Sequence, residues 1–88
     1  MFTLPSRIAV ITGGAGALGL AIAETLHSLG AHIVLLGRSP EKMEQALTQL
    51  DSQRTRSSHY VCDVSDEASL ISVYNKIISI HSKVDILV

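Results

Sequence analysis

Cysteine and long apolar stretches are scarce in this 88-residue sequence, and each scarcity excludes a class of protein. The one cysteine, Cys62, rules out an internal disulfide framework, and the histidines nowhere have the spacing of zinc ligands. No run approaches the roughly 18 apolar residues that a membrane helix needs, and the first residues show no targeting pattern. We therefore expect a metal-free cytoplasmic protein that neither crosses nor binds a membrane.

An excess of charge of either sign is also missing. Seven Lys and Arg residues stand against eight Asp and Glu residues, which leaves a net charge of −1 and no electrostatic reason to bind nucleic acid. With 47% hydrophobic residues the chain can fill a core. A chain this short buries only roughly 60–70% of its unfolded surface, so we expect one small domain of marginal stability.

Short β-branched runs alternate with longer segments of helical period, the pattern of βαβ units that build a parallel sheet. The first apolar run covers residues 8–11, and residues 13–19 directly after it contain four of the six glycines. A helical stripe follows, which Gly30 is placed to end. Its apolar residues are Leu18, Ile22, Leu26 and Leu29.

The second unit consists of a strand over residues 33–36 and a helix over residues 40–50. Ser39 is predicted to cap this helix, and Pro40 suits its first position. Residues 51–58 form the one polar loop, and its two arginines, Arg54 and Arg56, are interpreted as solvated charges without a function.

The third unit is a strand over residues 59–62 and a helix that Ser65 is predicted to cap. A fourth apolar strand covers residues 84–88. The apolar residues assigned to the buried face of the third helix are Leu70, Tyr74, Ile77 and Ile78.

The glycine-rich turn between the first strand and the first helix suits the binding of a diphosphate. Without Cβ atoms the backbone can approach the ligand closely, and the amide groups at the helix start face its charge. Gly14, Gly16 and Gly19 satisfy G-x-G-x-x-G. No Lys followed by Ser or Thr closes the turn, which excludes a P-loop, and Gly37 stands where a methyltransferase would need an acidic residue.

A second reading of the same turn is T-G-x-x-x-[AG]-x-G, formed by Thr12, Gly13, Ala17 and Gly19. In this form the sequence resembles the short-chain dehydrogenase/reductase family, and the resemblance extends along the whole chain. It implies a Rossmann-type, three-layer α/β fold with a partial parallel sheet of about four strands. Right-handed crossovers give the order 3-2-1-4, with two helices on one face and one on the other.

The resemblance also assigns cofactor-binding residues. Asp63 and Val64 look like the family's Asp-Val pair, which contacts the adenine. Residues 84–88 look like the strand that leads into the family's Asn-Asn-Ala-Gly segment, which this sequence does not contain. The turn residues implied in binding the diphosphate are Gly13, Gly14, Ala15, Gly16, Leu18 and Gly19.

The end of the second strand distinguishes the two nicotinamide cofactors. A carboxylate there would accept hydrogen bonds from a free ribose 2′-hydroxyl, whereas an arginine pairs with a 2′-phosphate. Here Gly37 occupies the acidic position and Arg38 follows it. By analogy with the family, Arg38 with help from Ser39 favours NADP over NAD, although the second basic residue of many NADP-dependent relatives is replaced by Gly16.

The family's catalytic Tyr-x-x-x-Lys is not present. Tyr60 and Tyr74 are followed four residues later by Val64 and Ile78, so we assign no catalytic residue and no metal ligand. The resemblance implies a cofactor-binding part of an oxidoreductase that moves hydride between a nicotinamide and a small alcohol or carbonyl substrate.

Residues 1–88 are therefore expected to be the N-terminal part of a longer enzyme, inactive when isolated and homo-oligomeric at full length. The remaining alternatives are a stand-alone nucleotide-binding or regulatory module and a non-functional remnant. A cooperative melt raised by NADP would favour the module.

Overall fold

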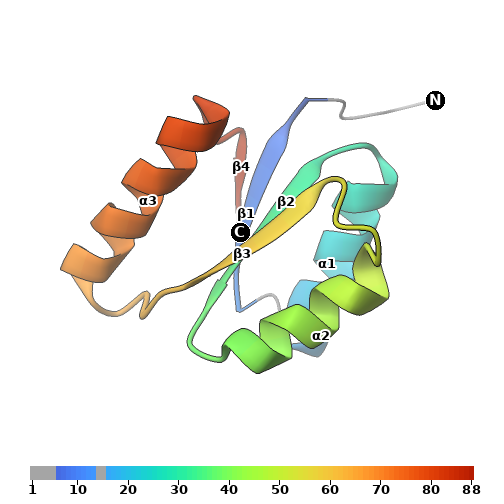
Figure 1. The fold of residues 1–88 in the computed structure, drawn as a ribbon, viewed down its shortest axis with the longest axis horizontal. Coiled ribbons are helices and arrows are strands. Elements are labelled where there is room, and N and C mark those ends of the chain that lie inside the picture. Colours follow the sequence, from blue (N-terminus) through green and yellow to red (C-terminus); the bar gives the residue numbers. More distant parts are fainter. Residues whose placement is uncertain (1–5, 14–15) are drawn as a thin grey trace.

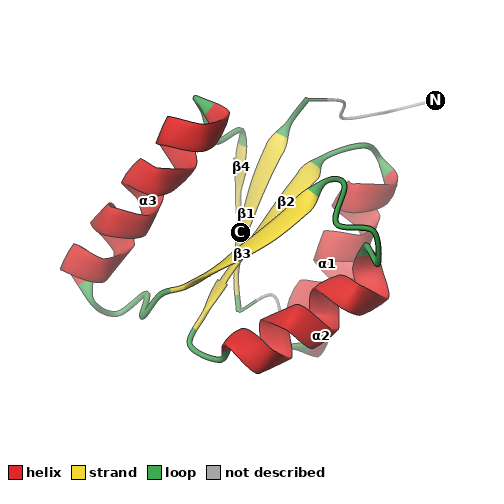
Figure 2. Cartoon of the chain, in the orientation of Figure 1, coloured by secondary structure: helices red, strands yellow, loops and turns green. Residues whose placement is uncertain are grey.

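A computed structural model of the chain describes residues 6–13 and 16–88. Strands and helices alternate along these residues, as the hydrophobic pattern predicts, and the four strands form one sheet (Figures 1 and 2). The elements are β1 (Ile8–Thr12), α1 (Ala17–Ser28), β2 (His32–Gly37), α2 (Pro40–Leu50), β3 (Ser57–Val61), α3 (Glu67–His81) and β4 (Ile86–Leu87).

The sheet is parallel with the strand order β3-β2-β1-β4, which confirms the predicted topology. Thr12 pairs with Leu36 and Leu36 with Tyr60, so the carboxyl ends of β1, β2 and β3 meet at one edge of the sheet. All turns that leave these strands therefore start at this edge. The predicted fourth strand is shorter than expected, because only Ile86 and Leu87 pair with β1.

Side chains of the central strands alternate between two apolar layers, as expected for a sheet covered on both faces. Ile33 and Leu35 of β2 pack in the layer that contains α1 and α2, whereas Val34 and Leu36 pack in the layer that contains α3. Figure 1 shows α1 and α2 together on one side and α3 alone on the other. The predicted three-layer arrangement is confirmed.

The helix ends follow known capping rules, with one correction. Gly30 has φ of +106° directly after α1, and the Ser39 hydroxyl oxygen accepts the Lys42 amide at 3.3 Å, as predicted for these two positions. The cap of α3 is Asp66, not Ser65: the Asp66 carboxylate accepts the Ala68 amide at 3.1 Å.

The faces of α1 and α3 also differ from the predicted stripes. Leu18 and Tyr74 were predicted to be core residues, but their exposed fractions are 77% and 48%. Leu18 lies in the first turn of α1, and the buried face begins one turn later, where Ala23 is fully covered. On α3 the buried residues are Val73 and Ile77.

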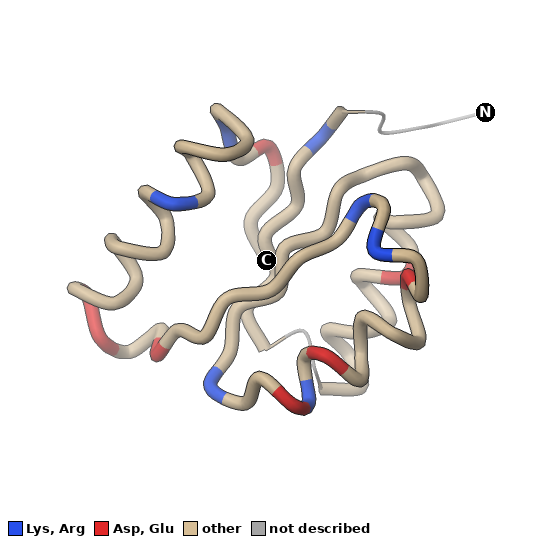
Figure 3. Tube along the Cα trace, viewed as in Figure 1, with Lys and Arg blue, Asp and Glu red and all other residues tan. Residues whose placement is uncertain are grey.

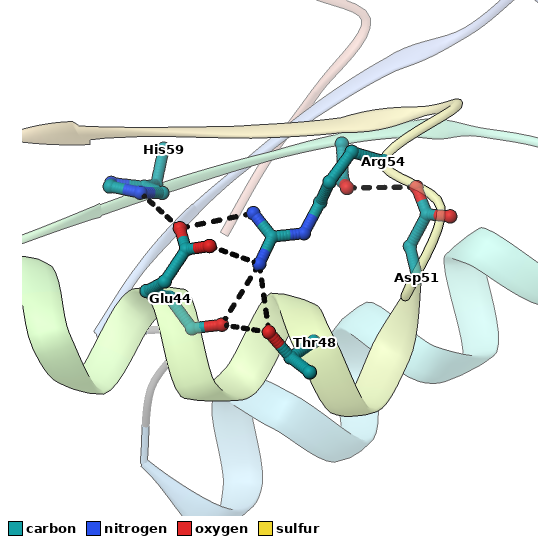
Figure 4. A network of polar contacts seen from close by, with 6 residues as sticks. Glu44, Thr48, Asp51, Arg54 and His59 are labelled. Carbon is teal, nitrogen blue, oxygen red and sulfur yellow. Dashed lines mark hydrogen bonds and ion pairs between the residues drawn. The ribbon is translucent and has the colours of Figure 1, made fainter.

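The loop between α2 and β3 is ordered by polar contacts rather than solvated. Arg56 donates to the main-chain oxygens of His27 and Ala31 at 2.9 and 3.2 Å, while Arg54 pairs with Glu44 and donates to Thr48 (Figure 4). The interpretation of both arginines as solvated charges was wrong. Strand β3 also begins two residues earlier than predicted, at Ser57.

A buried carboxylate fixes the start of this loop. Asp51 accepts the Arg56 amide at 2.9 Å and the Ser57 hydroxyl at 2.8 Å. Burial raises the pKa of the Asp51 carboxyl, but these hydrogen bonds outweigh burial and bring the pKa down to about 2. The loop therefore closes around a charged group, which ties β3 to the end of α2.

Candidate cofactor-binding edge of the sheet

The predicted site residues that the structure describes gather at the carboxyl edge of the sheet. The glycine turn leaves β1, Arg38 and Ser39 leave β2, and Asp63 and Val64 follow β3. A hydrogen bond of 2.8 Å from the Cys62 amide to the Gly37 oxygen continues the β2–β3 pairing up to this edge. Crevices at this edge of open α/β sheets are the usual place for ligands.

The glycine turn is shaped by one backbone conformation and by unfilled space. Gly13 has φ of +67°, which strongly favours glycine, and its amide donates to the Leu36 oxygen at 3.1 Å. Among the described residues, a Cβ atom on Gly13 would meet nothing within 4 Å, and one on Gly16 would meet only the Gly13 oxygen at 3.5 Å. The surrounding described residues therefore leave space above the turn. Gly14 and Ala15 lie outside the described residues.

The amide groups that start α1 face this space without competition from a capping side chain. Gly16 is the N-cap in an extended conformation, and its lack of a side chain leaves the first-turn amides available to a ligand. Leu18 is exposed beside them and Gly19 is half-buried. A diphosphate would be suited to this helix start, because its charge complements the positive end of the helix dipole.

Arg38 and Asp63 contact each other directly. The Arg38 Nη2 atom lies 3.2 Å from the Asp63 Oδ1 atom, although the residues are 25 positions apart in sequence. The same oxygen accepts the Ser65 hydroxyl at 2.6 Å and the Ser65 amide at 3.0 Å. These Ser65 contacts, followed by Arg38, hold the pKa of the Asp63 carboxyl below its usual range, so the group is charged at neutral pH.

Ser39 and Val64 also lie at this edge of the sheet, where Ser39 contributes a hydroxyl and Val64 an exposed apolar side chain. The Ser39 hydroxyl oxygen caps α2, yet its proton remains available to donate to a ligand. Val64 is 47% exposed and lies at one wall of an apolar groove of about 490 Å³ between α3 and the sheet. Thr12 also lines this groove, and its hydroxyl donates to the Val88 oxygen at 2.9 Å.

This groove was not predicted from the sequence. Five of the eight large hydrophobic side chains that are exposed in the described part of the chain line it, among them Ile71 and Tyr74 of α3. The signal was present in the sequence: apolar residues of α3 occur on more than one helical face, which is more than packing on one sheet requires. The remaining three of the five are Val64, Leu87 and Val88.

Neither the distribution of charge along the chain nor the metal-ligating side chains of the described residues point to a second kind of ligand at this edge of the sheet. Segments of both signs are spread along the trace (Figure 3), and residues 6–13 and 16–88 contain no group of three or more His, Cys, Asp or Glu side chains able to hold a metal ion. None of the helices described is long and apolar enough to cross a membrane.

A parallel sheet of this order, with a glycine turn and a helix start at the end of β1, defines a Rossmann-like α/β protein. The family model for short chain dehydrogenases matches residues 7–88. The chain belongs to the short chain dehydrogenase family, whose members are oxidoreductases.

Particular relatives support this assignment. The chain is 35% identical over 85 residues to the 2,3-dihydro-2,3-dihydroxybenzoate dehydrogenase of Bacillus subtilis, covering 97% of this chain and 33% of the relative. It matches a metagenomic short-chain oxidoreductase in complex with NADP at a TM-score of 0.89 and 30% identity, covering 96% of this chain and 38% of that one.

An NAD⁺-bound xylitol dehydrogenase matches at a TM-score of 0.88 and 30% identity, covering 94% and 32% of the two chains. The chain thus spans about a third of the length of the relatives it matches. Its solved relatives include proteins that bind either nicotinamide cofactor, so the family alone does not decide between NADP and NAD.

Proposed function

We propose that residues 1–88 are the N-terminal part of a Rossmann domain that binds NADP in a short-chain dehydrogenase/reductase-type oxidoreductase. The observation that carries the proposal is the meeting of an open glycine turn, an uncapped helix start and Arg38 at one edge of the sheet. The space above Gly16, which a Cβ atom could enter without a clash, fits a ligand that approaches the backbone closely.

Each part of the edge has a role in this proposal. The amides of Gly13 and Gly16 already donate to the Leu36 and Gly13 oxygens, so these residues shape the turn. The remaining main-chain amides of residues 14–19, including those of Leu18 and Gly19, hold the diphosphate, as helix starts do. Arg38 and Ser39 bind the ribose 2′-phosphate through charge-assisted and hydroxyl hydrogen bonds. Asp63 and Val64 contact the adenine, the first through its carboxylate and the second through its main chain.

The bound nicotinamide would supply or accept a hydride in the oxidation of a small alcohol or the reduction of a carbonyl. The chain's own residues bind and orient the cofactor. Because no Tyr in the sequence is followed by Lys at the fourth position, we propose that the acid/base groups lie outside residues 1–88 and that the isolated chain is inactive.

Replacing Arg38 tests the proposed cofactor. Arg38→Gln should weaken NADP binding about tenfold, because a charge-assisted hydrogen bond at a largely exposed site is lost, and should change NAD binding less than about threefold. Titration calorimetry of the purified chain with each cofactor measures both affinities. Lys76→Gln, which removes an exposed cation on α3, is the matched control. An equal loss for NADP and NAD, or no binding of either by the unchanged chain, would contradict the proposal.

A further inference from the structure

The ion pair between Arg38 and Asp63 joins two turns that the sheet holds side by side. Arg38 follows β2 and Asp63 follows β3, and these strands are neighbours paired as far as Gly37 and Val61. The strand backbone therefore fixes the distance between the two turns. The contact does not depend on a flexible loop meeting another by chance.

The two members of the pair are not equally constrained. Asp63 is held by two further hydrogen bonds to Ser65, and 43% of its side chain is exposed. The Arg38 side chain is 75% exposed and contacts Asp63 through one of its terminal nitrogens. Asp63 is thus the fixed partner, and the remaining guanidinium donors of Arg38 face solvent, where a phosphate can reach them.

We propose that Asp63 is a positioning residue that sets the preference between NADP and NAD by competing with the ribose 2′-phosphate for the guanidinium of Arg38. This inference rests on the proposed function. When the ribose carries a free hydroxyl, Asp63 neutralises Arg38, and the dinucleotide meets no unpaired cation. When the ribose carries a phosphate, the guanidinium of Arg38 must be shared with or released from Asp63, which weakens its pairing with the phosphate.

The competition operates across the neutral range of pH. The Ser65 hydroxyl and amide and the Arg38 guanidinium all hold the pKa of Asp63 below its usual range, so the carboxylate keeps its charge throughout the neutral range of pH. The chain therefore accepts NADP without excluding NAD. A site of this kind differs from one in which an unpaired arginine selects NADP alone.

Asp63→Asn separates this role from a simple contact with the adenine. Asparagine keeps an oxygen that can accept the Ser65 hydrogen bonds but loses the charge that competes for Arg38. Calorimetric affinities for NADP and NAD should show that this change raises the preference for NADP about fivefold. In an Arg38→Gln background the same change should alter the preference less than about twofold, because no guanidinium remains to compete for.

Two further variants control the experiment. Glu67→Gln removes an exposed carboxylate from the first turn of α3 and should leave the preference within about twofold, since Glu67 has no recorded contact with Arg38. Asp63→Glu keeps the charge and should keep a preference nearer to that of the unchanged chain than Asp63→Asn does.

The proposal is overturned if Asp63→Asn changes both affinities equally, or if it shifts the preference by the same factor with and without Arg38. Binding of neither cofactor by the unchanged chain would instead refute the proposed function, and the inference with it. A ligand-free measurement stands beside these: carboxyl-carbon NMR should show a higher Asp63 pKa in Arg38→Gln than in the unchanged chain. An unchanged pKa would show that the ion pair does not form in solution.

Discussion

At the scale of single residues, Gly13 and Gly16 separate the two reasons for placing glycine in a turn. Gly13 is needed for its backbone angle, because φ of +67° disfavours a side chain even where space is free. Gly16 has an ordinary extended conformation and open space, so its lack of a Cβ atom matters only when a ligand is close. The protein's own folding therefore constrains the first glycine more than the second.

This difference predicts that substitution of Gly13 mainly affects stability and substitution of Gly16 mainly affects binding. Gly13→Val should lower the free energy of unfolding by about 2 kcal/mol, because a β-branched residue is strained at positive φ. Gly16→Ala should lower it by only about 0.5 kcal/mol but should weaken NADP binding, because its Cβ atom occupies the space above the turn. Urea denaturation and cofactor titration measure the two effects. Equal stability losses would contradict this assignment.

Asp51 makes a second residue-scale prediction, on pH. Its folded pKa of about 2 lies below the usual value of 3.8, so its contribution to stability is fully present above about pH 4 and is lost as the pH falls towards 2. Asp51→Asn should lower stability at pH 7 by about 1–3 kcal/mol and should flatten the acid limb of the stability profile. Thermal melts between pH 2 and pH 7 test this. A profile with the same acid limb in both proteins would refute it.

Contacts between individual side chains were harder to predict from the sequence than the order of the elements or of the strands. The polar side chains of residues 51–58 indicate a loop, but nothing local shows that Arg56 reaches the end of α1 or that Asp51 is buried. These contacts join segments 25 to 29 positions apart and exist only once the sheet has formed. The pairing of Arg38 with Asp63 depends in the same way on the β2–β3 alignment, whereas the presence of both residues at one edge follows from the strand order.

At the scale of elements, substitution at the start of α3 tests which residue caps this helix. Asp66→Ala should lower the free energy of unfolding by about 1 kcal/mol, because the Ala68 amide loses its acceptor and the helix start loses a negative charge. Ser65→Ala is the matched comparison and should cost less, since Ser65 contacts Asp63 rather than the helix amides. Chemical denaturation compares the two, and a larger loss for Ser65→Ala would place the cap where the sequence suggested.

The existence and order of the elements could be read from hydrophobic period and glycine placement, but their limits could not. Ser65 and Asp66 are both good capping residues, and only backbone geometry distinguishes them. The predicted apolar stripe on α1 began too early, because Leu18 fits the helical period and yet is exposed in the first turn of the helix.

At the scale of the whole molecule, the strand order brings the proposed cofactor-binding residues to one edge of the sheet, while part of the apolar surface is left exposed. The groove between α3 and the sheet has exposed hydrophobic side chains on both walls, including Tyr74 and Leu87. One helix covers this face and two cover the other (Figure 1). The placement of one helix on this face and two on the other was predicted, but the residues that line the groove required the actual position of α3.

The central claim is that main-chain amides around the glycine turn receive the diphosphate of NADP. The most direct test is amide NMR of the isotopically labelled chain during titration with NADP. We expect the largest shift changes to fall on Gly13, on residues 16–19 and on Arg38, and to saturate together. Changes concentrated at the opposite edge of the sheet, around Leu29 and Gly30, or no saturable change at the turn, would contradict it.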